Sequence, residues 1–171
     1  MKIVVAVDGS ELAEAAIAAV APVARAAQAE VVLVAVRQRG LIHETWAPVG
    51  RARDGQAARI PGAEPSSGGH PPMLAIEDRG QAMERARTET DEALRDLAKE
   101  YLEGVSCRTH VEWADDIPAT IVHIAEAEGA DFIALGTHGR TGLKSSLMGS
   151  VAQGVLRHTA IPVVFARRSR Q

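Results

Sequence analysis

Five short apolar runs recur along the chain, and each has the length of a β-strand. Most of these runs are continuously apolar, which is typical of parallel strands that are covered on both faces. They predict strands over Lys2–Val7, Val31–Val36, Val105–Val111, Ala130–Leu135 and Ile161–Ala166.

Four segments between these runs carry the three- and four-residue spacing of amphipathic helices. The predicted buried stripe of the first helix, which begins at the N-cap residue Ser10, is Leu12, Ala16, Ala19, Val23 and Ala27. The predicted stripe of the second is Met83, Ala86, Thr90, Leu94, Leu97 and Tyr101, and that of the third is Ile117, Ile121 and Ile124. We expect Asp115 or Asp116 to cap the third helix, with Pro118 in its first turn. The fourth runs roughly from Gly149 to His158 and ends before Pro162.

Alternation of strands and helices predicts an α/β fold with a single doubly wound, five-stranded parallel sheet and helices on both faces. Ligands of such sheets bind at the carboxyl ends of the strands, where the strand order reverses. This rule points to Asp8–Ser10, to the end of the second strand near Val36 and to the loop that begins at Gly136.

Composition narrows the class of protein. The chain has 171 residues, of which 46% are apolar and 24% charged, and we expect one domain over 1–171. A net charge of −3 and 3% aromatic residues give no indication of nucleic acid or membrane binding. The single cysteine, Cys107, is expected to be an inert thiol in a buried strand and is compatible with a reducing cytoplasm. No segment resembles a signal peptide or a membrane span, so a cytoplasmic protein is expected.

Residues 38–72, "QRGLIHETWAPVGRARDGQAARIPGAEPSSGGHPP", interrupt this pattern. The stretch is rich in Gly, Pro, Ala and Arg and has neither the strand nor the helix period. Loops longer than roughly 12–15 residues are usually functional lids or disordered insertions. We favour a mobile insertion over a substrate lid.

The richest candidate chemistry lies in "ADFIALGTHGRTGLKSSLMGSV", residues 130–151. Gly136-Thr-His-Gly139 is followed after nine residues by Gly149, Ser150 and Val151, which open the fourth helix. The spacing matches neither a Walker loop nor a G-x-G-x-x-G dinucleotide motif. Glycines still allow backbone N–H groups to approach phosphate oxygens, and a helix N-terminus favours anions. Hydroxyl and cationic groups that could add to such a site are Arg140, Lys144, Ser145, Ser146 and Ser150. An ordinary β–α turn would explain two of the glycines without any ligand.

The arrangement G-x2-G-x9-G-S resembles the ATP-binding signature of the universal stress protein family. "KIVVAVDGSELAEAAI", "AEVVLVAV" and "GADFIALGTHGRTGLKSSLMGSVAQGVLRHTAIPVVFAR" resemble the family's opening, second strand and closing third. The resemblance covers the chain except for the 38–72 insertion. It implies a Rossmann-like fold of the adenine nucleotide alpha hydrolase-like type, binding of ATP, and a homodimer formed through the last strand, Ile161–Ala166.

Carried over by position, the resemblance assigns nine residues to nucleotide. Asp8 and the backbone near Val36 would face adenine. Gly136, His138 and Gly139 would lie against the ribose and the α- and β-phosphates, and Gly149, Ser150 and Val151 against the phosphate tail. Ala6 stands where many members have proline, a change of shape that removes no hydrogen-bond donor.

Several of these residues have a plainer interpretation. Asp8 could serve only to cap the first helix or the adjacent turn, and His138 is expected to pack on ribose instead of acting as a general base. The histidines show no metal-ligand spacing, so a resident metal site is not expected, although Mg²⁺ or Mn²⁺ could arrive with the nucleotide phosphates.

Three functions of different classes fit the sequence: an ATP-responsive regulatory module in stress response, a slow ATP hydrolase, and a dimeric scaffold that does not use nucleotide. The intact glycine motif argues against the scaffold. The absence of a Walker lysine or an evident base argues against a dedicated hydrolase. We therefore favour the regulatory module, which would act on a downstream protein partner.

Overall fold

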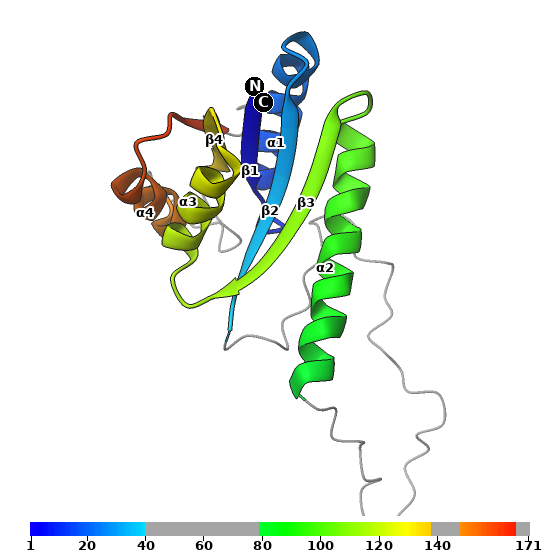
Figure 1. The fold of residues 1–171 in the computed structure, drawn as a ribbon, viewed down its shortest axis with the longest axis vertical. Helices are drawn as coiled ribbons and strands as arrows, with labels where there is room; N and C mark the ends of the chain where they lie inside the picture. The colour runs from blue at the N-terminus through cyan, green and yellow to red at the C-terminus, as the bar shows by residue number, and fades with distance from the viewer. Residues whose placement is uncertain (40–78, 138–147, 167–171) are drawn as a thin grey trace, which may run out of the picture.

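The structure, a computed structural model, describes residues 1–39, 79–137 and 148–166. Strands and helices alternate through these ranges (Figure 1). The strands are β1 (Lys2–Ala6), β2 (Glu30–Gln38), β3 (Ser106–Ala114), β4 (Phe132–Gly136) and β5 (Val163–Ala166). The helices are α1 (Glu11–Ala26), α2 (Arg79–Tyr101), α3 (Ile117–Glu128) and α4 (Ser150–His158). Of the predicted 38–72 insertion, the structure describes Gln38 and Arg39, and the rest lies outside the described residues.

The five strands form one parallel sheet in the order β3-β2-β1-β4-β5. The chain moves outward from β1 to β3 and then crosses over to β4 on the other side of β1. This reversal confirms the predicted doubly wound α/β fold, and it places the topological switch point between β1 and β4. β3 and β5 are the two edges of the sheet.

Helices cover both faces of the sheet, which explains why the strands are continuously apolar. Ile3 and Val5 of β1 belong to a core cluster with α1 and α2, whereas Val4, between them, belongs to a second cluster with α3 and α4. All three are fully buried. Figure 1 shows the result: α2 lies along β3, and α3 and α4 lie together at the other side of the molecule. Since successive side chains point to opposite faces, neither face of a central strand can be polar.

The start of α1 is as predicted, but its buried face is not. Ser10 caps the helix by accepting a hydrogen bond from the Ala13 N–H at 3.2 Å. The predicted stripe is wrong at Ala19, Val23 and Ala27, which are all exposed, Val23 to 48%. The face that is buried consists of Ala13, Ala16, Ile17, Val20, Ala21 and Ala24. Nearly every position of this helix is apolar, so the spacing of apolar residues could not identify the inner face.

The other helices follow their predicted patterns more closely. Thr90, Leu94 and Leu97 of α2 are buried, although Met83 is 36% exposed. Asp116 caps α3 by accepting from the Ala119 N–H at 3.0 Å, and Gly129 ends that helix in the left-handed conformation with φ of 65°. Pro118 lies in its first turn and α4 ends at His158, as expected.

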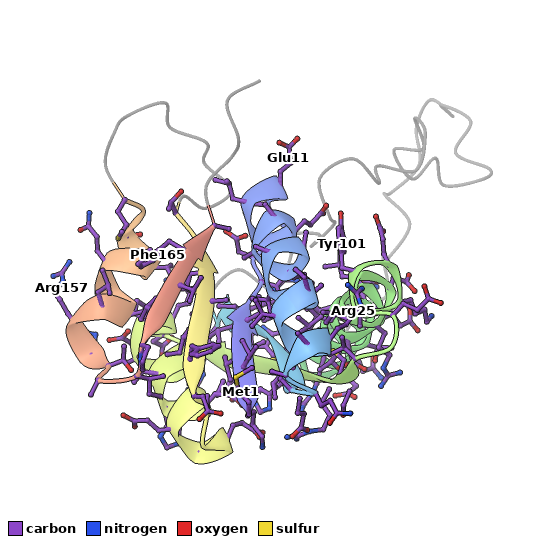
Figure 2. The ribbon with its side chains drawn as sticks, turned by 90° about the horizontal axis from the view of Figure 1, so that it is seen from above. Met1, Glu11, Arg25, Tyr101, Arg157 and Phe165 are labelled. Atoms are coloured by element: carbon purple, nitrogen blue, oxygen red, sulfur yellow. The ribbon has the colours of Figure 1, made fainter. Side chains whose placement is uncertain are left out.

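The strands start within two residues and end within three residues of the predicted bounds. β5 begins at Val163 because Ile161 and Pro162 precede the ladder, and the Pro162 carbonyl accepts a hydrogen bond from Ile133 N at 3.0 Å. Figure 2 shows Phe165 of β5 on the side of the strand that faces α4. Within the described residues, none of the helices is both long and apolar enough to cross a membrane.

Candidate functional site

A cavity of about 170 Å³ opens at the carboxyl ends of β1, β2 and β4, beside the switch point. Its remaining walls come from the N-terminal parts of α1, α3 and α4. The lining residues are Ala6, Val7, Asp8, Ala13, Val34, Val36, Ile117, Ile121, Leu135, Gly136, Thr137, Gly149, Ser150, Val151 and Ala152. The cavity therefore lies where the strand order predicts a ligand.

The structure brings together around this cavity every predicted site residue that it describes. These are Ala6, Asp8, Val36, Gly136, Gly149, Ser150 and Val151. His138 and Gly139 lie outside the described residues. The sequence motif does not indicate the contribution of α3, because the helical spacing of Ile117 and Ile121 predicts only that they belong to the buried stripe. The same helical spacing suits a core residue and a cavity-lining residue, because the cavity lies next to the core between α3 and the sheet.

One part of the cavity is apolar. Val34 and Val36 contribute from β2, Ile117 and Ile121 from α3, and Leu135 from β4. Val34, Ile121 and Leu135 are themselves buried members of the core. Such a wall suits a flat apolar ring that reaches its polar partners through its edge.

The N-terminus of α4 forms the polar end. The first intrahelical hydrogen bond runs from Gln153 N to the Gly149 carbonyl at 3.0 Å, so the N–H groups of Ser150, Val151 and Ala152 have no acceptor inside the helix. Gly149 is the N-cap and supplies no side-chain acceptor. These amides and the positive end of the helix dipole favour an anion in the cavity.

The N–H of Gly149 itself has a partner. It donates to the carbonyl oxygen of Thr137 at 2.8 Å, which joins the two ends of the segment that contains His138 and Gly139. This N–H is therefore already paired within the chain. The hydrogen bond instead holds the start of α4 against the end of β4, because Thr137 directly follows that strand.

Gly136 has a packing reason to be glycine. A β-carbon built at this position would lie 2.9 Å from Cβ and 3.0 Å from the backbone carbon of Leu12. Carbon atoms in contact normally lie about 3.5–4.0 Å apart, so a side chain would push the start of α1 away from β4. The first glycine of the motif thus lets α1 approach the floor of the cavity closely.

Asp8 has a local partner at the mouth of the cavity. One of its carboxylate oxygens, Oδ1, accepts a hydrogen bond from the Ser10 N–H at 3.0 Å across Gly9, whose φ is 81°. Of the plainer roles that the sequence left open, Asp8 therefore has the one in the turn, while Ser10 caps α1. Asp8 is also the one ionisable side chain among the described residues that line the cavity. These residues hold no acid–base pair of the kind that positions and activates a water.

The model of the universal stress protein family matches residues 62–167. A universal stress protein of Methanocaldococcus jannaschii, MJ0531, is 36% identical over 89 residues, which are 52% of this chain and 52% of that protein. A second from the same organism, MJ0577, is 34% identical over 95 residues, which are 55% of this chain and 59% of that protein. The matched stretches thus span little more than half of these curated relatives.

Solved structures give a more complete match. The structure of MJ0577 has a TM-score of 0.68 at 26% identity and covers 99% of this chain and 97% of its own. A universal stress protein from Archaeoglobus fulgidus, solved in complex with dAMP, has a TM-score of 0.59 at 22% identity and covers 98% of both chains. The second likeness shows a shared fold, and the nucleotide is a property of that relative.

Proposed function

Because this chain belongs to the universal stress protein family, we propose that it binds ATP and acts as a nucleotide-responsive regulatory module. The observation that carries the proposal is the cavity itself. It joins an apolar wall to three unpaired helix amides, and it gathers the predicted site residues that the structure describes. An adenine nucleotide has the same two parts in the same order, a flat ring and an anionic tail.

The adenine ring is assigned to the apolar part, between the end of β2 and Ile117 and Ile121 of α3. Asp8 is assigned to the 6-position of the ring, where it supports adenine over guanine, since a carboxylate only accepts hydrogen bonds and adenine has an amino group there where guanine has a carbonyl. The relative solved with dAMP supports the same class of ligand. The backbone near Val36 would supply the remaining edge contacts.

The phosphates are assigned to the start of α4. Ser150, Val151 and Ala152 offer N–H groups there, and Ser150 adds a hydroxyl. The absence of a side chain on Gly149 leaves room for a phosphate oxygen. Gly136, His138 and Gly139 complete the proposed site, and Mg²⁺ or Mn²⁺ would be carried by the phosphates and water.

Regulation is favoured over turnover as the use of this nucleotide. Among the described lining residues, Asp8 is the one group that could take a proton, and it already accepts from Ser10 N. A site that holds phosphate by backbone amides without a positioned base would hydrolyse ATP slowly. We accordingly place the protein in the cytoplasmic stress response, where a partner would read its nucleotide state.

A homodimer through β5 belongs to the same proposal. β5 is an edge strand, and Val164 on it is 46% exposed. Exposed apolar edges are aggregation hazards that proteins usually cover. Pairing of two β5 strands would cover this edge.

The test is native mass spectrometry of the purified protein, followed by calorimetric titration with ATP and GTP after any bound nucleotide has been removed. We expect co-purified or added ATP at one site per chain, with GTP binding more weakly. A protein that carries no nucleotide and binds neither compound would favour the scaffold function. Release of ADP at a rate of many turnovers per minute would favour the hydrolase.

A further inference from the structure

The two helices that frame the cavity meet at one very close contact, between Pro118 of α3 and Gly154 of α4. A β-carbon built on Gly154 would lie 2.5 Å from Cγ and 2.6 Å from Cβ of Pro118. Carbon atoms in contact are normally about 3.5–4.0 Å apart, so glycine lets α4 approach α3 by about 1 Å more than any other residue would. The proline ring cannot rotate away from such a contact.

Nothing local to α4 calls for glycine at this position. Gly154 lies inside the helix, is buried and has no left-handed backbone to accommodate. Glycine is among the least favourable residues in a helix interior, and alanine is the most favourable. Glycine at 154 is therefore explained by its approach to Pro118.

This contact lies beside the cavity. Ile117, the neighbour of Pro118, lines the apolar wall, and Ser150, one helical turn before Gly154, lines the polar end. Pro118 also borders the adjoining surface hollow together with Ser150 and Val151. The separation of α3 and α4 at Pro118 consequently sets the separation of these two walls.

We infer that Gly154 is a positioning residue for the phosphate end of the site: through Pro118 it holds the first amides of α4 at the place where they meet bound phosphate. The inference rests on the proposed function and adds a residue outside the glycine motif. Hydrogen bonds from these amides depend steeply on distance and direction. Apolar contact with adenine is non-directional and tolerates small displacements. A shift of α4 should therefore weaken the binding of ATP far more than the binding of adenosine.

The experiment compares wild type with Gly154→Ala by calorimetric titration with ATP, and with adenosine by competition, after circular dichroism has shown that each variant is folded. We expect ATP to bind about ten- to a hundredfold more weakly to Gly154→Ala, the equivalent of losing one hydrogen bond to a charged group, with adenosine affinity within about twofold of wild type. The matched control is Leu156→Ala on the same helix, where the side chain is 47% exposed and the contact with α3 is left intact. It should bind both ligands like wild type.

A second variant keeps the test decisive if Gly154→Ala folds poorly. The exchange Gly154→Ala with Pro118→Gly removes both ring atoms that the new methyl group would meet, and it should restore the fold and ATP affinity together. Three outcomes would each overturn the inference. Folded Gly154→Ala could bind ATP with wild-type affinity, it could lose affinity for ATP and adenosine equally, or the exchange variant could fail to recover ATP affinity. A wild-type protein that binds neither ligand would overturn the proposed function and this inference with it.

Discussion

The backbone N–H of Gly149 donates a hydrogen bond to the carbonyl oxygen of Thr137 at 2.8 Å, so the residue that opens α4 is held against the end of β4. Eleven residues of the glycine-rich motif, 138–148, separate the two partners in the sequence. Because this N–H is already paired, Gly149 can serve a ligand only by lacking a side chain. The amides that remain for a ligand are those of the next three residues, Ser150, Val151 and Ala152.

Gly149→Val should abolish ATP binding while leaving the fold intact. Gly149 has φ of −60° and ψ of 154°, an extended conformation that valine adopts readily, and its hydrogen bond to Thr137 uses backbone atoms only. The added side chain would occupy space proposed for phosphate. Ser150→Ala, which removes one hydroxyl, should cost less, about 1.5–3 kcal/mol of binding free energy. Calorimetry with ATP and melting curves measure both, and normal ATP binding by folded Gly149→Val would contradict the assignment.

Asp8→Ala and Asp8→Asn should separate the two roles of this residue. Asparagine keeps an oxygen that can accept from the Ser10 N–H, so Asp8→Asn should melt like wild type, whereas Asp8→Ala should lose about 1 kcal/mol of unfolding free energy. Both changes remove a carboxylate that only accepts hydrogen bonds, so both should reduce the preference for ATP over GTP. Titration of each variant with both nucleotides tests this. An unchanged preference in Asp8→Asn would mean that Asp8 acts only in the turn.

Stability should fall in acid through an ion-pair network at the amino ends of the strands. Hydrogen bonds from Arg108 lower the pKa of Glu30 and of Glu128, with Lys2 contributing to both. A carboxylate whose folded-state pKa is lowered stabilises the protein above its unfolded pKa, near 4.5, and this contribution is lost as the pH falls through the folded value. Titration of these two carboxylates should therefore change the melting temperature little between pH 7 and about pH 5.5, and should lower it below about pH 4.5.

Arg108→Met should flatten that acid dependence and lower the melting temperature modestly at pH 7, since the network is exposed to solvent. Lys99→Met, which removes an isolated surface pair with Asp96, is the matched control and should leave the acid dependence unchanged. Melting temperatures of the three proteins are measured between pH 3.5 and pH 7 at low salt. If the melting temperatures of wild type and Arg108→Met fall in parallel with pH, the prediction is wrong.

Cys107 should react slowly with thiol reagents in the native protein. Burial raises the pKa of its thiol to about 11, so the reactive thiolate is scarce at pH 8. Relative to a thiol with a pKa near 9, the thiolate fraction at pH 8 falls about a hundredfold. The native reaction should accelerate as the pH rises toward 11, and unfolding in urea should make it fast at pH 8. A native rate equal to the rate in urea would show that the thiol is freely ionised.

Val164→Lys should convert the proposed homodimer to monomer. The charge would lie on the edge strand β5, where lysine opposes strand pairing, at a position that is 46% exposed in the single chain and so tolerates a long polar side chain. Met83→Lys on α2, 36% exposed and on the side of the sheet that bears β3, is the control and should remain dimeric. Sedimentation at micromolar concentration compares them. A monomeric wild type would remove the dimer from the proposal.

The sequence by itself determined the order of the elements and the edge of the sheet at which the site would lie. Continuous apolar strands require cover on both faces, and residues such as Ser10 and Asp116 cap their helices through contacts three residues away. These are local or averaged properties, so they can be read without knowledge of long-range contacts. The alternation of strands and helices also predicts that ligands bind at the carboxyl ends of the strands, whereas the switch point between β1 and β4 depends on the strand order.

Tertiary structure alone decided which atoms face one another. α1 is apolar nearly all round, so only packing on the sheet could leave Val23 exposed and bury Val20. Gly136 and Gly154 look like other glycines in the sequence, and only Leu12 and Pro118, which lie far away along the chain, give the reason for each. Likewise, the pairing of the Gly149 N–H with Thr137 depends on where α4 lies against β4. A side chain's spacing limits which face it can occupy, but the partner on that face is set by close packing between distant segments.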